Sequence, residues 1–196
     1  MTKAIIFDLN GVFVKSPKLS ERFEQDFGIS EDVFMPALKD VMAQVRLPDA
    51  KDFFGYWQPY FEKWNLKFNR EEFLEYWFGS ETLDVEMVKL AKELKTKGVK
   101  LFILSNNLRE RSLYYDEHFE ILNEIFDKKY FSWQTSFVKP DMQAYKLILE
   151  ENNLKPEECI YFDDSEKNIA VSNYLGIKSF LFEGVEKTKS VLKNII

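Results

Sequence analysis

Four short apolar runs constrain the fold of this chain more than any other feature of its sequence. They cover Lys3–Asp8, Val99–Ser105, the run CIYF that ends at Phe162, and Ile177–Phe182. Each is too short for a typical helix and is rich in β-branched or aromatic residues. Such runs predict strands that are buried on both faces, as the strands of parallel sheets are.

Helical patterns alternate with these runs. They cover residues 84–98, with Gly98 as a stop signal, then 116–126, 141–154 just after Pro140, 165–174 and 185–195. Alternating strands and helices predict an α/β fold with a doubly wound, Rossmann-like parallel sheet. Ligands of such sheets collect beyond the carboxyl ends of the strands.

Residues 16–80 interrupt this alternation. They contain no strand pattern, several amphipathic helical patterns such as residues 30–46 and 69–79, and a dense set of aromatic residues. We therefore predict two domains: an α/β core formed by residues 1–15 and 81–196, and a small all-helical cap formed by residues 16–80, inserted after the first strand.

Charge and composition narrow the classes of function. The 196-residue chain carries a net charge of -6, which argues against sequence-independent binding to nucleic acids or anionic membranes. No apolar run is as long as a membrane span, and the single cysteine, Cys159, excludes an intrachain disulfide. We expect a soluble, cytoplasmic protein that is a monomer or a homodimer.

Polar side chains stand at or near the predicted strand ends, where a parallel sheet would bring them to one edge. Carboxylates that lie close together repel one another unless a cation sits among them, and their hard oxygen atoms suit Mg²⁺. A hydroxyl, a backbone amide and a lysine are natural partners of phosphate oxygens. The residues concerned are Asp8, Asn10, Ser105, Asn106, Lys139, Asp163 and Asp164.

The segments that carry these residues form an ordered set. The stretches FDLNGV, ILSNN, VKP and YFDDS resemble, in order and context, the four motifs of the haloacid dehalogenase-like (HAD) superfamily. The helical insert is similar to the cap of its subfamily IA, and the double aspartate resembles its DD/ED variant. Within the superfamily, the chain is most similar to sugar-phosphatase-like members, including the glucose-1-phosphate phosphatase branch.

The resemblance implies a metal centre and a nucleophile. Asp8 would attack phosphorus and form an aspartyl-phosphate. Asp8, the backbone carbonyl of Asn10 and Asp164 would hold Mg²⁺ directly, and Asp163 would act on it through water.

The resemblance also implies a phosphate site. Ser105 and the main-chain N–H of Asn106 would bind the phosphate, and Lys139 would neutralise both Asp8 and the transferring group. The implied function is Mg²⁺-dependent hydrolysis of a small phosphorylated metabolite, for instance a sugar phosphate.

Asn10 departs from the pattern of the superfamily. Most of its phosphatases have an aspartate two residues after the nucleophile, which protonates the leaving group and then activates water. An amide does neither, and losing a positioned acid–base group costs a factor of roughly 10² to 10⁴ in rate. The loss matters less for a good leaving group, such as that of an anomeric, acyl or aryl phosphate.

Three alternatives remain open at Asn10. The chain can be a weakened or silenced member that binds a phosphorylated ligand or partner, or Asn10 can be an engineered substitution that traps a complex. A haloacid dehalogenase needs no leaving-group acid, but those enzymes carry tyrosine at this position and need no Mg²⁺. Outside the motifs, Arg46 could reach a substrate anion, although a lone arginine in this context is better interpreted as a surface residue.

Overall fold

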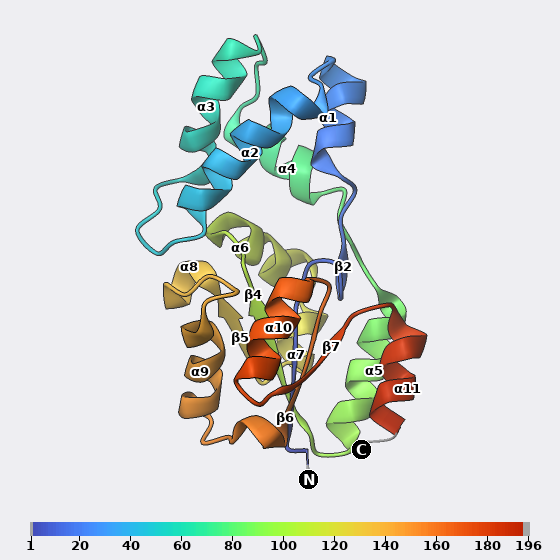
Figure 1. Ribbon diagram of the computed structural model, residues 1–196. Helices are drawn as coiled ribbons and strands as arrows, with labels where there is room; N and C mark the ends of the chain where they lie inside the picture. Colours follow the sequence, from blue (N-terminus) through green and yellow to red (C-terminus); the bar gives the residue numbers. More distant parts are fainter. Residues whose placement is uncertain (1, 194–196) are drawn as a thin grey trace.

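The computed structural model describes residues 2–193, and a parallel five-stranded sheet lies at the centre of the core (Figure 1). The order of its strands is β5-β4-β1-β6-β7. β1 pairs with both β4 and β6, so that the carboxyl ends of these three strands lie side by side. The α/β, Rossmann-like class predicted from the sequence is confirmed. The strands are β1 Ala4–Phe7, β4 Lys100–Ser105, β5 Lys128–Phe131, β6 Cys159–Asp163 and β7 Lys178–Leu181.

The side chains of alternate residues in the central strands are buried against opposite layers of helices. In β1, Ile5 and Phe7 belong to one apolar cluster, whereas Ala4 and Ile6 belong to another. This alternation follows from the period of two along a strand, and burial on both faces explains the continuous apolar runs in the sequence.

Helices on both faces complete the core (Figure 1). Leu90 of α5 and Leu192 of α11 join the cluster of Ile5, and Tyr145 of α9 and Ile169 of α10 pack with that of Ile6. The helices of the core are α5 Val85–Thr96, α6 Arg109–His118, α7 Ile121–Ile125, α8 Ser132–Thr135, α9 Met142–Glu151, α10 Glu166–Tyr174 and α11 Val185–Lys193. Within residues 2–193, no helix is long and apolar enough to cross a membrane.

Four helices stand beyond the carboxyl edge of the sheet (Figure 1). They are α1 Leu19–Phe27, α2 Glu31–Val45, α3 Phe53–Lys63 and α4 Arg70–Phe78, and we call them the cap. Their own cluster is mostly aromatic and is centred on Phe23, Trp57 and Phe73. A division of the chain at residues 15/16 and 80/81 stays a prediction.

Two short strands flank the cap at its junction with the core. β2, Val14–Lys15, pairs antiparallel with β3, Thr82–Leu83. The chain therefore leaves the core and returns to it at one place.

The structure differs from the prediction at the edge strand β5 and at the helix predicted over 116–126. The edge strand β5 was not predicted, because its residues Lys128 and Lys129 give no apolar run; an edge strand tolerates lysine, which also discourages pairing with other chains. The helix predicted over 116–126 is wrong in its bounds: α6 begins earlier and ends before Phe119, which leaves helical geometry at φ -125 and ψ 50. The helix predicted over 185–195 is present to Lys193, and its last predicted residues lie outside the described ones.

Candidate active site

Three aspartates meet at the carboxyl edge of the sheet. Asp8 follows β1, and Asp163 ends β6 with Asp164 directly after it. Each offers a carboxylate oxygen, and these oxygens all lie within 4.8 Å of one another. The pairing of β1 with β6 produces this arrangement from residues that are more than 150 positions apart in the sequence.

A buried lysine lies between two of these carboxylates. Lys139 Nζ is 2.9 Å from Asp8 Oδ1 and 2.7 Å from Asp163 Oδ2. Asn106, just after β4, holds the backbone of this lysine with two hydrogen bonds: its Nδ2 donates to the Lys139 carbonyl at 2.8 Å, and its Oδ1 accepts from the Lys139 N–H at 2.7 Å. The Asn106 side chain therefore positions Lys139.

Asp163 is completely buried, and both of its oxygens are engaged. Besides Lys139, they accept hydrogen bonds from the Tyr161 hydroxyl, the Ser165 N–H at 2.8 Å and Asn168 Nδ2 at 3.0 Å. A carboxylate with this many donors is held rigidly. This favours a role in orienting Lys139; the part that the resemblance gives Asp163 in metal binding stays a prediction.

Asp8 presents one oxygen that has partners and one that is free among the described residues. The Leu9 N–H donates to Oδ1 at 2.7 Å, and Lys139 pairs with the same atom. Burial raises the pKa of the Asp8 carboxyl from 3.8 to about 6; Lys139 opposes this rise, and the charge of Asp163 adds to it. Oδ2 is thus the atom available to a metal or to phosphorus.

The residues at this edge fit a divalent cation. Asp8 and Asp163 are buried and Asp164 is exposed, and these three carboxylates with one lysine leave two negative charges close together. Partial desolvation of its carboxyl and the charge of Asp163 also raise the pKa of Asp164. The turn at Gly11, with φ +87, lets Asp164 approach, because a Cβ there would lie 2.3 Å from Asp164 Oδ2. A hard cation such as Mg²⁺ would balance this charge.

The two residues predicted to bind phosphate stand next to this cluster. Ser105 is the last residue of β4 and is buried, and Asn106 follows it. The structure thus brings all seven sequence-predicted residues to one edge of the sheet. It also shows the clamp from the Asn106 side chain to Lys139, which the sequence did not suggest.

The side chain of Asn10 is fixed in one orientation. Its Nδ2 donates to the Tyr115 hydroxyl at 2.7 Å, and that hydroxyl donates its single hydrogen to Glu81 Oε2 at 2.5 Å. The hydroxyl can therefore only accept from residue 10, which keeps the amide nitrogen on that side. Asn10 Oδ1 is buried and has no hydrogen-bond partner among the described residues.

Sequence reasoning missed the charged network behind Asn10. Glu81, next to β3, is buried and pairs with Arg111 of α6, and Ser16, next to β2, bonds to both. These residues lie far apart in the sequence and carry no motif. The network joins the Asn10 turn to the two segments, next to β2 and β3, where the chain passes between core and cap.

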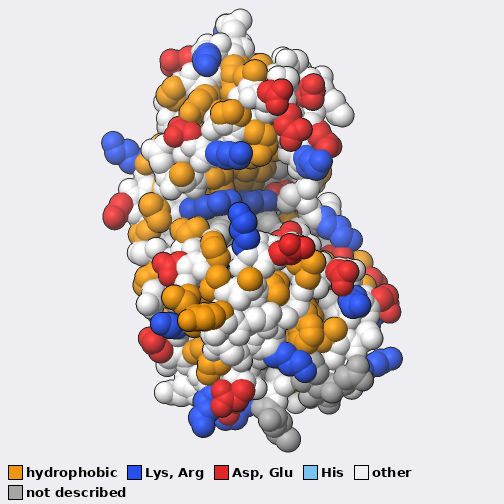
Figure 2. Space-filling view, viewed as in Figure 1, with side chains coloured by type: hydrophobic (Ala, Val, Ile, Leu, Met, Phe, Trp, Pro, Cys, Tyr) orange, Lys and Arg blue, Asp and Glu red, His pale blue; other side chains and the backbone are white. Residues whose placement is uncertain are grey.

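Arg46 does not behave as the surface residue that the sequence suggested. It is half-buried, and its Nε is buried without a hydrogen-bond partner. It directly follows α2, whose carboxyl end points toward the core (Figure 1). Burial and the charge of Arg111 lower the pKa of its guanidinium, while Asp8 raises it. Lys and Arg side chains also gather where the surface is hollowed between cap and core (Figure 2).

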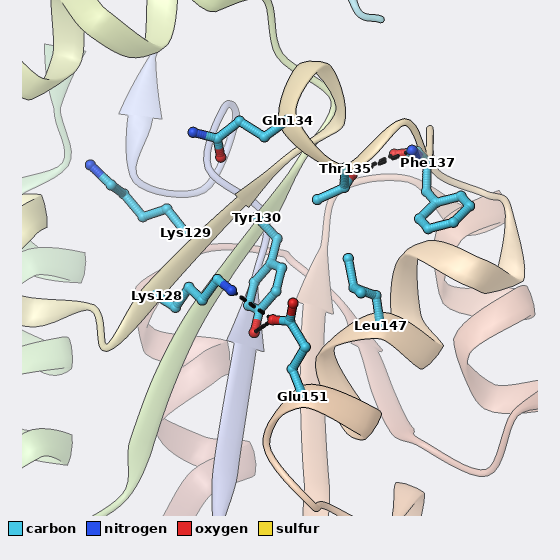
Figure 3. A pocket seen from close by; sticks show the side chains of 8 residues that line it. All are labelled: Lys128, Lys129, Tyr130, Gln134, Thr135, Phe137, Leu147 and Glu151. Atoms are coloured by element: carbon cyan, nitrogen blue, oxygen red, sulfur yellow. Dashed lines mark hydrogen bonds and ion pairs between the residues drawn. The ribbon is translucent and has the colours of Figure 1, made fainter. Parts of the chain in front are cut away.

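A separate pocket of about 430 Å³ opens beside β5 (Figure 3). Its polar groups contact one another: Glu151 accepts from Lys128 at 2.6 Å and from the Tyr130 hydroxyl at 2.8 Å. None of the seven predicted site residues lines it. We therefore place the candidate active site at the carboxylate cluster.

The fold and the carboxylate cluster together define an α/β protein with a candidate metal centre at the carboxyl edge of its sheet. The chain belongs to the haloacid dehalogenase-like hydrolase family, whose family model matches residues 5–182. The resemblance seen in the four sequence motifs is confirmed at the level of the family.

Known proteins that resemble this chain include enzymes of several activities. The bifunctional epoxide hydrolase 2 of Sus scrofa is 23% identical over 214 residues, which cover 98% of this chain and 38% of that protein. The chain thus spans well under two thirds of that relative. The D-ribitol-5-phosphate phosphatase of Bacteroides thetaiotaomicron is 30% identical over 59 residues, 30% of this chain and 29% of that protein.

A solved structure matches over nearly the whole length. A HAD family enzyme of Bacteroides thetaiotaomicron superposes with a TM-score of 0.84 at 20% identity and covers 97% of this chain and 98% of its own. A second structure of that enzyme, in complex with magnesium and inorganic phosphate, gives a TM-score of 0.78 at 20% identity over 92% and 94%. At this identity the likeness shows the fold.

Proposed function

We propose that this chain is a Mg²⁺-dependent phosphatase of a small phosphorylated metabolite, and that Asp8 is its nucleophile. The observation that carries the proposal is the free Oδ2 of Asp8, beside a lysine that is held between two aspartates. The phosphatases among the relatives support it, as do the magnesium and phosphate in the similar structure.

In the proposed reaction each residue has a task that its contacts suit. Asp8 attacks phosphorus and becomes an aspartyl-phosphate, which water then hydrolyses. Lys139 neutralises charge on Asp8 and on the transferring group, and Ser105 with the Asn106 N–H binds phosphate oxygens. Asp163 and the Asn106 side chain keep Lys139 in place.

The metal would be held by Asp8, the Asn10 carbonyl and Asp164, with Asp163 behind them. When bound, Mg²⁺ supplies positive charge at the phosphate oxygens. The cap would exclude water from the site when it closes. We also propose that the cap comprises residues 16–80.

Turnover is the test of this proposal. Release of phosphate from p-nitrophenyl phosphate is measured with and without MgCl₂, for the unchanged chain, for Asp8→Asn and for Asp49→Asn, an exposed aspartate of the loop after α2. We expect turnover that needs Mg²⁺, is abolished by Asp8→Asn and is unaffected by Asp49→Asn. Equal turnover by Asp8→Asn would refute the proposal.

Asn10 favours a second candidate function, a phosphate-binding protein without turnover. The side chain at this position is an amide whose nitrogen is already bonded to Tyr115, so it supplies no proton to a leaving group. Binding of inorganic phosphate in the presence of Mg²⁺, without turnover of any phosphate ester or acyl phosphate, would favour this candidate.

A further inference from the structure

The side chains of Asn10 and Arg46 determine which kind of leaving group can depart from the site. This inference rests on the proposed function. Asn10 is held by Tyr115, and the side-chain atom that it leaves for a ligand is an acceptor oxygen. A leaving group that needs a proton would therefore receive none from this residue. A leaving group that departs as a stable anion needs no proton.

Arg46 offers what such an anion requires. An arginine stays protonated at physiological pH, and within residues 2–193 no carboxylate pairs with its guanidinium. A half-buried cation without a partner is costly, and its buried Nε is a hydrogen-bond donor with nothing to bond. Asp8 lies within its electrostatic reach. The side chain is thus a ready site for an anion near the nucleophile.

The neighbouring arginine does not compete for this task. Arg111 is neutralised by Glu81, and the Ser16 hydroxyl accepts from it at 3.0 Å. Of these two arginines, only Arg46 has no ion-pair partner among residues 2–193, and its single positive charge matches one negative charge. A planar guanidinium binds a carboxylate with two parallel hydrogen bonds. A leaving group that carries a phosphate would bring at least one more negative charge than the single guanidinium of Arg46 balances.

We propose that Arg46 binds the leaving group of the substrate, that this group departs as a carboxylate, and that the substrate is a small acyl phosphate. An oxygen of Asp8 bonds to phosphorus while the bond from phosphorus to the acyl oxygen breaks. Its electron pair stays on the carboxylate, which Arg46 stabilises. Water then adds to phosphorus, the bond to Asp8 breaks, and both water hydrogens leave with the phosphate as H₂PO₄⁻.

The test measures hydrolysis of acetyl phosphate with MgCl₂ by the unchanged chain and by Arg46→Met, Arg46→Lys and Asp8→Asn. Arg109→Met serves as the matched control, because Arg109 is an exposed arginine on α6. We expect Arg46→Met to lower kcat/KM, which reports transfer of the phosphoryl group to Asp8, by about 10², as loss of one positioned donor does. Arg46→Lys keeps the charge but loses the two parallel hydrogen bonds, so its kcat/KM should lie between those of Arg46→Met and the unchanged chain. Arg109→Met should have no effect.

A series of aryl phosphates distinguishes a leaving-group role from a role at the transferred phosphate. If Arg46 stabilises the departing oxygen, Arg46→Met makes kcat/KM depend more steeply on the pKa of the leaving phenol. A parallel loss across the series, with the same slope, would overturn the assignment. A structural role alone would not change the slope.

The outcomes also separate this inference from the proposed function. If Asp8→Asn abolishes hydrolysis of acetyl phosphate and Arg46→Met leaves it unchanged, the phosphatase function stands and the inference fails. If Asp8→Asn hydrolyses acetyl phosphate as fast as the unchanged chain, the proposed function itself fails.

Discussion

Lys139 shows at the scale of a single residue how the site depends on charge balance. It is the cation that both Asp8 and the fully buried Asp163 contact. Removing one partner of a buried ion pair leaves the other uncompensated and costs about 3–5 kcal/mol. The same residue therefore serves stability and the proposed chemistry.

We predict that Lys139→Met lowers the free energy of unfolding by about 3–5 kcal/mol and abolishes phosphate release. Urea unfolding followed by circular dichroism measures the first effect. Lys128→Met is the matched control, because the Lys128–Glu151 pair is exposed and should change stability by less than about 1 kcal/mol. Equal effects of the two substitutions would contradict this account.

A second prediction at the scale of a single residue concerns Gly11. Its φ of +87 disfavours any side chain, and a Cβ there would press on Asp164 Oδ2. Gly28 also has a positive φ, but a Cβ there would meet nothing within 4 Å. We predict that Gly11→Ala and Gly28→Ala each lose about 1–2 kcal/mol of stability, and that only Gly11→Ala weakens Mg²⁺ affinity measured by calorimetry. Unchanged affinity in Gly11→Ala would remove Asp164 from the metal site.

At the scale of elements, Asp84 joins the junction strands to the core. Its Oδ1 accepts from the Glu86 and Met87 N–H groups at 3.0 and 3.1 Å, which caps α5, and its Oδ2 pairs with Lys15 of β2 at 2.7 Å. A lost N-cap costs about 1 kcal/mol.

We predict that Asp84→Ala destabilises the chain by about 1–2 kcal/mol and that Asp84→Asn, which keeps an acceptor for the cap, costs less. Asp141→Ala is the control, since Asp141 caps α9 through the Gln143 N–H alone. Thermal unfolding of the variants would measure the differences. A larger loss in Asp84→Asn than in Asp84→Ala would show that the cap does not account for the effect.

Elements were predictable from the sequence where one signal determined them. β1, β4 and β6 lie inside the sheet, and their continuous apolar runs follow from cover on both faces. β5 and β7 are the two edge strands: β5 has no apolar run, and β7 is only partly buried. The break at Phe119 between α6 and α7 has no Gly or Pro to mark it.

In the candidate site, too, only the residues marked by a local sequence pattern could be predicted. Residues at strand ends could be found from local patterns, since the sheet brings those ends together. The burial of Arg46 and the contacts of Glu81 with Arg111 and Tyr115 depend on how the cap meets the core. No local pattern contains that information.

At the scale of the whole molecule, metal binding should be coupled to stability and pH. Burial raises the pKa of Asp8 to about 6, above its value in the unfolded chain. Without metal, the folded state therefore loses stability as pH rises from about 4 to about 6, because the buried carboxylate becomes charged. Mg²⁺ binds the deprotonated form and restores that loss.

We predict that MgCl₂ raises the melting temperature more at about pH 7.5 than at about pH 5. The Asp8→Asn variant should lose most of this pH dependence. An equal rise at both pH values in the unchanged chain would contradict the placement of the metal beside Asp8.

The most direct test of the central claim is to trap the phosphorylated protein. The chain is mixed with acetyl phosphate and MgCl₂, quenched in acid, and digested for mass spectrometry. Because Asn10 does not activate water, the aspartyl-phosphate should accumulate, so we predict one added phosphoryl group on the peptide that contains Asp8, and none in Asp8→Asn. Phosphate release without any phosphoryl group on that peptide would contradict the account.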